Sequence, residues 1–459
     1  MRLFLFFLLS FCGAICGVQA RDEVKHGATD LVFTGEESKE AILGLDDAGY
    51  KLNAWNRAGD MTIFMAAAAK NSADTVEALI EAGGDFNLKN PNGFTALSYA
   101  ALSNPDPEVI KVFMKKGADF GITDKMGATL LMLAAGFNKS VPVVQALLDA
   151  GAKAGEVTPS GMTALMFAIG NKAPVGIVRS LIAAGENVNH FYKGQSLLFH
   201  AFLAKNPPEV IGVLISAGAN VHARETEYGR SVLMEAALQG TPETVRLLLE
   251  RGASPALADA EGNTALFYAV RNKEHGKDII SLLIEHGANV NASNNDKSNP
   301  YMLALYLGNL DAAKVLWKAG GNLGQEFLDM GFTTLIWTAA FGAEPSILNS
   351  LIYPHTLKER DKLGNTALAR VAAFGKNYNV AQILLNAGAD VNETNDAGCT
   401  PLMLAAKYSE NANMVLTLLN ADANLYAQDN DGRTAFDYAK DNENPQILET
   451  LKNYANGML

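Results

Sequence analysis

The sequence predicts an all-α solenoid, built from about twelve pairs of short helices that stack side by side and are joined by β-hairpin turns. The first observation is a set of helix-opening Thr, Ser or Asn residues that recur every 33–35 residues. The second is that most units end in a turn such as Ala-Gly-Ala. Self-similarity at a fixed period of this size indicates a repeat architecture. The helix-opening residues are Thr62, Thr95, Thr129, Thr163, Ser196, Ser231, Thr264, Asn299, Thr333, Thr366, Thr400 and Thr434.

The first helix of a unit is most clearly defined within residues 229–262. Ser231 can cap a helix over 232–238, because its side-chain oxygen can accept a backbone N–H at the helix start. Gly240 is expected to end that helix in a left-handed conformation. The pair Thr241-Pro242 then supplies a cap and a first-turn residue for a second helix. Two short helices therefore follow back to back.

The second helix of the same unit has one apolar face. Val245, Leu248 and Leu249 recur at i, i+3 and i+4, which is the spacing of a buried helical stripe. Gly252 closes the helix, and residues 259–262 are expected to form a tight turn before the next unit. Helices of this length are marginally stable alone in water. Neighbouring units must therefore cover them.

The repeated phrases resemble the ankyrin repeat. First helices open with phrases such as GFTALSYAA from Gly93, GNTALFYA from Gly262 and GCTPLMLAA from Gly398. Second helices end in phrases such as LLIEHGANVN, which finishes at Asn291. The resemblance covers about residues 40–452. It implies helix-turn-helix units with β-hairpin turns, and a non-catalytic scaffold that binds a protein or peptide partner on its concave face.

The N-terminus has the features of a secretory signal peptide. Arg2 precedes an apolar run, and Val18-Gln19-Ala20 has the small residues of a cleavage site. We therefore expect an exported protein, periplasmic or secreted, with no stable membrane span after cleavage; an uncleaved anchor is the alternative. The predicted segments are a signal peptide (1–20), a flexible leader (21–39), an N-terminal capping half-repeat (40–54), the ankyrin repeat domain (55–453) and a tail (454–459).

The charge pattern does not favour a nucleic-acid partner. The formal net charge is −12, and single charges of both signs are scattered instead of clustered Lys and Arg. Only Cys399 remains once residues 1–20 are removed, so no intrachain disulfide is expected. We expect the fold to be held by packing alone and the protein to be a monomer.

Aromatic residues are enriched at the positions that the ankyrin resemblance assigns to the binding face. Rigid aromatic side chains are common interface anchors, although any one of them can instead pack between adjacent hairpins. The densest run lies in the C-terminal third, and we expect the partner to bind there. The candidate partner-binding residues are Tyr306, Phe332, Phe341, Phe374, Tyr408, Phe94, Phe137, Tyr192 and Tyr228.

Catalytic, cofactor and metal sites are not expected. The histidines lack metal-ligand spacing, and no nucleotide-binding phrase occurs in a suitable context. A ladder of methionines three residues after the caps suggests copper binding, but gap-filling in the core explains it better. Cys399 lies directly before Thr400 and is a candidate redox-sensitive thiol if partly exposed; otherwise it is a small residue tolerated in a turn.

One segment departs from the repeat pattern. Tyr353-Pro354-His355 replaces the usual Gly-Ala turn, so the stretch from Leu351 to Lys362 is a longer loop, a kink or a functional protrusion. An enzyme or inhibitor with this segment as its active element is one alternative function. An immunity-like or enzyme accessory protein, or a secreted host-directed effector, is another. Fold resemblance alone does not choose among these functions.

Overall fold

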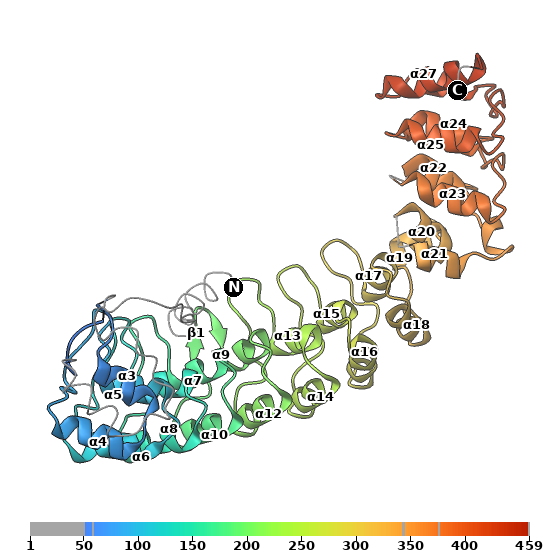
Figure 1. Ribbon diagram of the computed structural model, residues 1–459. Helices are drawn as coiled ribbons and strands as arrows, with labels where there is room; N and C mark the ends of the chain where they lie inside the picture. Colours follow the sequence, from blue (N-terminus) through green and yellow to red (C-terminus); the bar gives the residue numbers. More distant parts are fainter. Residues whose placement is uncertain (1–50, 57–58, 342–344, 375–376, 458–459) are drawn as a thin grey trace. The chain divides into compact units, whose positions relative to one another are not determined.

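The computed structural model describes residues 51–56, 59–341, 345–374 and 377–457. The predicted signal peptide, the leader and residues 40–50 of the predicted capping half-repeat lie outside these described residues. The chain forms two units, one ending at Ala219 and the other beginning at Asn220. Within each unit, helix pairs stack in chain order (Figure 1).

The first unit contains five described helix pairs, in which first helices pack on first helices and second helices on second helices. The pairs are α3 (Ile63–Lys70) with α4 (Ala73–Glu81), α5 (Ala96–Ser103) with α6 (Pro107–Lys115), α7 (Leu130–Phe137) with α8 (Val141–Asp149), α9 (Ala164–Gly170) with α10 (Val175–Ala183), and α11 (Leu197–Leu203) with α12 (Pro208–Ser216). A short antiparallel hairpin of β1 (Phe191–Tyr192) and β2 (Gln195–Ser196) precedes α11.

The second unit contains seven described pairs, so the prediction of about twelve pairs is confirmed. They are α13 (Val232–Gln239) with α14 (Pro242–Glu250), α15 (Ala265–Arg271) with α16 (Gly276–Glu285), α17 (Pro300–Tyr306) with α18 (Leu310–Lys318), α20 (Thr334–Ala340) with α21 (Pro345–Leu351), α22 (Ala367–Phe374) with α23 (Tyr378–Asn386), α24 (Pro401–Tyr408) with α25 (Ala412–Leu419), and α26 (Ala435–Ala439) with α27 (Pro445–Ala455). Two shorter elements, α19 (Gln325–Asp329) and the 3₁₀ helix η1 (Thr356–Lys358), lie between them.

The predicted helix starts are confirmed, because each of the twelve helix-opening residues stands directly before a first helix. Most of them cap it through the side-chain oxygen, as Ser231 does by accepting the N–H of Met234 at 3.2 Å. Thr434 works differently. Its hydroxyl and its N–H both donate to the Asp437 carboxylate, at 2.8 and 2.9 Å.

The core lies along the facing sides of the helices. The predicted stripe of Val245, Leu248 and Leu249 is buried. Methionines that follow the caps are buried as well, and the sulfur atoms of Met132, Met234 and Met403 lie 3.3–3.5 Å from the N–H of their own capping residue. These three side chains therefore fill the core and accept a weak hydrogen bond.

The expected conformation of Gly240 is wrong. Gly240 is extended, with φ −86°, whereas Gly252 has the left-handed φ of +85° expected at the end of the second helix. The reason lies in the next repeat, where Asn272 donates from Nδ2 to the carbonyls of Ala237 and Gly240, at 3.1 and 3.2 Å. The carbonyls at the end of α13 are thus satisfied without a left-handed turn.

Most hairpin turns are built around one side-chain oxygen. An Asp or Asn five residues before the helix cap accepts two backbone N–H groups of its own turn, an arrangement that holds the turn. Asp259 shows it, accepting from Glu261 and Asn263 at 2.9 and 2.8 Å. The residues that do this are Asn90, Asp124, Asp259, Asn294, Asp361, Asn395 and Asp429.

The segment from Leu351 to Lys362 forms a compact turn. Thr356 closes it, because its hydroxyl donates to the Leu351 carbonyl and accepts the Tyr353 N–H, both at 2.8 Å. The helix α19 just before α20 was not predicted. Among the described residues, no helix is both long and apolar enough to cross a membrane.

Candidate functional site

The nine predicted partner-binding aromatics fall into three groups. Tyr228, Tyr306, Phe341, Phe374 and Tyr408 are 45–57% exposed, Phe137 is half-buried, and Phe94, Tyr192 and Phe332 are only 4–7% exposed. The buried rings pack inside the repeats, as Phe94 does against Tyr99, with centroids 5.7 Å apart. For these three residues, the structure agrees with the alternative stated above, in which the ring packs against other side chains and is not an exposed interface anchor.

Three of the exposed rings gather on the C-terminal repeats. We call Phe341, Phe374 and Tyr408, with the buried Phe332 beside them, the aromatic face. Phe374 and Tyr408 stack across adjacent repeats at 5.5 Å between centroids, and Phe332 lies 6.4 Å from Phe341. Tyr306 has no ring contact with them in the described part of the chain.

Supporting rings hold Phe341 in place. The ring of Phe327, on α19, lies 5.6 Å from it edge-on, and the ring of Trp337 lies 5.3 Å from it. Phe327 also contacts Phe332 at 5.7 Å. Such aromatic pairs add to the stability of apolar burial. The exposed edge of Phe341 is thus presented from a packed cluster.

A partly buried arginine contacts two rings of the aromatic face. The Arg370 guanidinium lies 5.0 Å from the Phe332 ring centroid and 5.8 Å from that of Phe374. It is ion-paired with the buried carboxylate of Asp361, the residue that also holds the turn before α22. Because this charge is neutralised within the fold, Arg370 fixes the rings rather than offering a free cation.

Two further cationic side chains, Lys407 and Arg433, lie over aromatic rings of the last repeats. Lys407 Nζ lies 4.8 Å from the Tyr408 ring centroid and 5.5 Å from that of Tyr438, and the Arg433 guanidinium lies 5.0 Å from Tyr438. Arg433 is paired with Asp429 and Asp431, at 3.0 and 2.7 Å. Within the described residues, no carboxylate lies within ion-pair distance of Lys407.

Cys399 is not the partly exposed thiol considered above. Its side chain is 6% exposed, and Sγ lies 3.4 Å from the hydroxyl oxygen of Tyr438 in the next repeat. Tyr438 in turn donates to Asp429. Burial on its own raises the pKa of Asp429, but the bonds from Tyr438 and Arg433 lower it to about 2. Burial and the bond to Asp429 raise the pKa of Tyr438. The thiol is therefore buried and lies next to a tyrosine hydroxyl that is itself held by a hydrogen bond.

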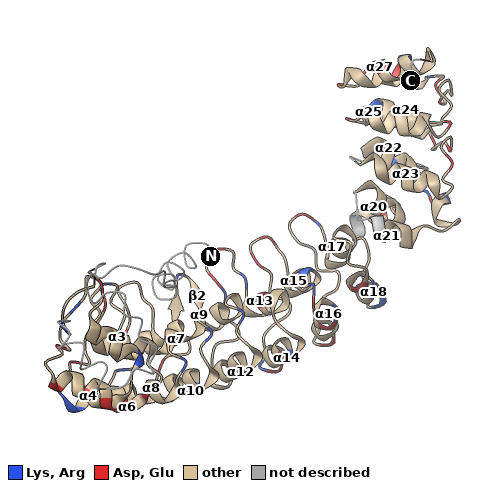
Figure 2. Ribbon diagram, in the orientation of Figure 1, with Lys and Arg blue, Asp and Glu red and all other residues tan. Residues whose placement is uncertain are grey.

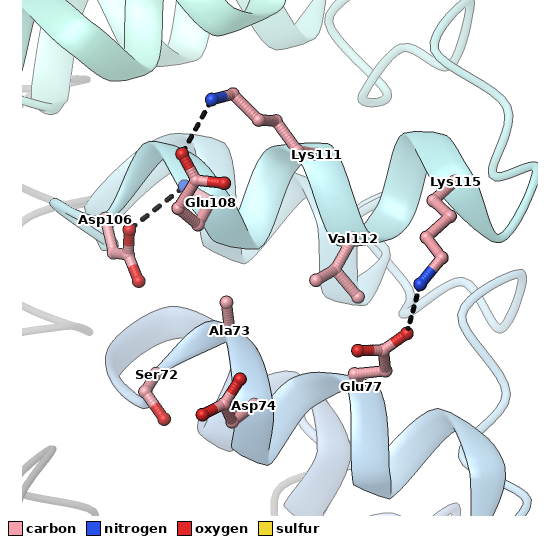
Figure 3. A pocket seen from close by; sticks show the side chains of 9 residues that line it. All are labelled: Ser72, Ala73, Asp74, Glu77, Asp106, Glu108, Lys111, Val112 and Lys115. Atoms are coloured by element: carbon pink, nitrogen blue, oxygen red, sulfur yellow. Dashed lines mark hydrogen bonds and ion pairs between the residues drawn. The ribbon is translucent and has the colours of Figure 1, made fainter.

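A separate hollow lies between α4 and α6 (Figure 3), with a volume of about 410 Å³. It is lined by Ser72, Ala73, Asp74, Glu77, Asp106, Glu108, Lys111, Val112 and Lys115. Lys111 pairs with Glu108 at 2.6 Å, and Lys115 with Glu77 at 3.0 Å. Exposed pairs of this kind contribute little to stability. They belong to a solvated helix surface, and we assign no ligand to it.

Charged side chains of both signs are interspersed along the helices and turns (Figure 2). In the described part of the chain, no three His, Cys, Asp or Glu side chains are grouped as metal ligands would be. The most distinctive chemical feature of the described surface is therefore the aromatic face with its cations.

Sequence comparison matches the whole repeat region to one family. The profile described as "Ankyrin repeats (3 copies)" matches overlapping windows from residues 37–124 to residues 370–458, which together cover residues 37–458.

Individual relatives match only parts of the chain. It is 43% identical over 81 residues to an ankyrin repeat-containing protein of Treponema pallidum (strain Nichols), a match that covers 18% of this chain and 26% of that protein. It is 29% identical over 216 residues to Rabankyrin-5 of Homo sapiens, covering 43% of this chain and 18% of that protein. The chain thus spans about a quarter or less of the length of these relatives.

Solved structures also resemble parts of the chain. The human ASB11 ankyrin repeat domain is 23% identical, with a TM-score of 0.44, over 50% of this chain and 99% of that domain. A chain from the complex of the Bd0816 predatory endopeptidase of Bdellovibrio bacteriovorus with the immunity protein Bd3460 is 27% identical, with a TM-score of 0.37, over 41% of this chain and 96% of its own length.

Proposed function

Because the chain belongs to the ankyrin repeat family, whose members generally serve as protein-interaction scaffolds, we propose that it binds a protein or peptide partner on the aromatic face without catalysing a reaction. The supporting observation is the set of half-exposed rings of Phe341, Phe374 and Tyr408 on a rigid stack. The rings lose little conformational freedom on binding, since neighbouring side chains already hold them. Aromatic anchors in such positions commonly dominate binding energy.

We propose further that the protein acts outside the cytoplasm, in the periplasm or after secretion. The support is the N-terminal sequence alone, with Arg2 before an apolar run and small residues at 18–20. Sequencing the N-terminus of the protein recovered from cell fractions tests this proposal. A mature chain that begins near residue 21 in the periplasm or medium would support it, and an unprocessed cytoplasmic chain would contradict it.

The binding proposal is tested by partner capture from the native compartment, with the mature chain as bait. Replacing Phe374 and Tyr408 together by Ala is expected to abolish capture, because the stacked pair offers the largest exposed apolar area of the face. The thermal unfolding midpoint is expected to change little, since both rings are about half exposed. Tyr426→Ala, which removes an exposed ring that is not among the candidate partner-binding residues, is the matched control and should capture normally. Undiminished capture by the double variant would refute the proposed surface.

A further inference from the structure

The unit that opens at Thr333 lacks the side-chain oxygen that holds most of the other turns; the unit that opens at Ser196, with Phe191 in that place, lacks it too. Five residues before Thr333 stands Leu328, in the place occupied by Asp259, Asp361 or Asn395 in other units. A leucine cannot accept the two turn N–H groups. The chain instead forms the short helix α19, in which the Leu328 N–H donates to the Gly324 carbonyl at 3.2 Å.

Two exposed apolar side chains lie beside a groove in this unit. Trp317 is 64% exposed and Leu328 is 42% exposed, although neither takes part in the aromatic face. The groove, which we call the α19 groove, has a volume of about 400 Å³. Its apolar lining includes Tyr301, Trp317, Leu323, Leu328, Leu335 and Leu351. Exposed apolar side chains grouped around a hollow are typical of binding sites.

The polar side of the groove comes from the irregular segment. Thr356 and Glu359 line it, and Glu359 is the one ionisable acid or base among its described lining residues apart from the phenol of Tyr301. Glu359 has no ion-pair partner among the described residues, while the adjacent Arg360 is paired with Glu393. A half-buried carboxylate next to an apolar hollow complements an apolar group that carries a cation beside it.

We propose that the α19 groove is a second peptide-binding site, which takes an apolar side chain of a basic peptide segment. The apolar side chain enters between Trp317 and Leu328, and a neighbouring Lys or Arg of the peptide pairs with Glu359. The net charge of −12 favours the approach of such a segment. The groove shares the buried Phe332 with the aromatic face but none of the exposed rings of that face, so this proposal does not depend on the function proposed for the aromatic face.

The test is selection of a phage-displayed library of random peptides on the mature chain. Enriched peptides are expected to carry Lys or Arg next to Leu, Phe or Trp. Synthetic copies should bind about tenfold more weakly to Glu359→Gln, because a charge-assisted hydrogen bond is lost. Binding should also weaken as salt concentration rises.

Two variants distinguish a loss of peptide binding in the groove from a loss of folding. Leu328→Asp restores the turn oxygen of the other units, so it should abolish peptide binding without lowering the thermal midpoint. Trp317→Ala removes an exposed ring and should weaken binding at unchanged stability. The double variant of Phe374 and Tyr408 should bind the peptides normally, which distinguishes this proposal from the preceding one. Acidic peptides, no enrichment, or binding unaffected by Glu359→Gln and Leu328→Asp would overturn it.

Discussion

A buried carboxylate is the residue that fits its repeat least well. Glu186 stands where other units have Ala152, Ala253 or Ala288, and it is only 5% exposed. Neither of its carboxylate oxygens has a hydrogen bond of normal geometry. Burial raises the pKa of Glu186, and the nearby N–H of Gly155 and hydroxyl of Thr163 oppose this only in part. The folded state therefore disfavours the charged form of this side chain.

We predict that Glu186→Ala raises the free energy of unfolding at pH 7, by about 1–3 kcal/mol. The folded state binds this proton more tightly than the unfolded state does, so protonation of Glu186 adds to the free energy of unfolding of the wild type. This contribution is fully present below the ordinary pKa of 4.5, and it is lost as the pH rises through the raised pKa of the folded state. Urea unfolding between pH 4 and 8 measures both effects. The exposed Glu250→Ala is the control, expected within about 0.5 kcal/mol of wild type. Destabilisation by Glu186→Ala at pH 7 would contradict the prediction.

For single residues, the sequence predicted where the aromatic side chains lie along the repeats better than it predicted whether each ring is buried or exposed. Phe332 and Phe374 were both assigned to the binding face, yet one is buried and the other exposed. Arg370 lies over both rings and is itself fixed by Asp361. Such contacts join different repeats, so local sequence spacing does not reveal them. The cation Lys407 was overlooked as well, although it directly precedes the predicted Tyr408 in the sequence.

At the scale of elements, a ladder of asparagines ties several repeats to the repeat before them. Asn138 donates from Nδ2 to the carbonyls of Ala101 and Asn104, at 3.1 and 2.7 Å. Asn272 and Asn442 make the equivalent pairs of bonds in their own repeats. Each of these side chains donates to carbonyls at the C-terminal end of a helix, where no further helical turn supplies N–H donors. The ladder therefore couples the end of one first helix to the next repeat.

We predict that Asn138→Ala lowers the free energy of unfolding by about 1–3 kcal/mol, because two buried carbonyls lose their donor. Chemical denaturation of the protein measures this change in the free energy of unfolding. Asn413→Ala serves as the control, since Asn413 is an exposed residue of α25 and should shift stability by less than about 0.5 kcal/mol. Equal effects of the two substitutions would show that the ladder contributes no stability.

The helices themselves were largely predictable, because each first helix carries its own cap in the sequence. The exceptions have local causes that the repeat pattern hides. The helix α19 forms where Leu328 removes the turn acceptor, and Gly240 stays extended because Asn272 satisfies the preceding carbonyls. In both cases the outcome depends on one hydrogen-bonding side chain, either missing from the turn or supplied by the following repeat.

For the whole molecule, stability arises from contacts between neighbouring pairs. The described helices of each pair are 5–11 residues long, and helices of this length need neighbours in order to persist. On α27, Ile447 and Leu451 are buried, whereas Glu449 and Lys452 are exposed.

We predict that deleting residues 434–459 makes the Cys399 thiol reactive. This deletion removes Tyr438, whose hydroxyl lies 3.4 Å from the sulfur, together with the buried cap residues of α26 and α27. A chain that begins at residue 21 contains no other cysteine, so its modification by a thiol reagent such as Ellman's reagent reports on this site alone. In the intact chain, modification should need local opening and be slow. In the shortened chain it should be at least about tenfold faster, because exposure of the thiolate controls the rate. Lys452→Ala alters only the exposed side of α27 and should leave the rate unchanged. Equal rates in the intact and shortened chains would mean that the terminal pair does not cover the thiol.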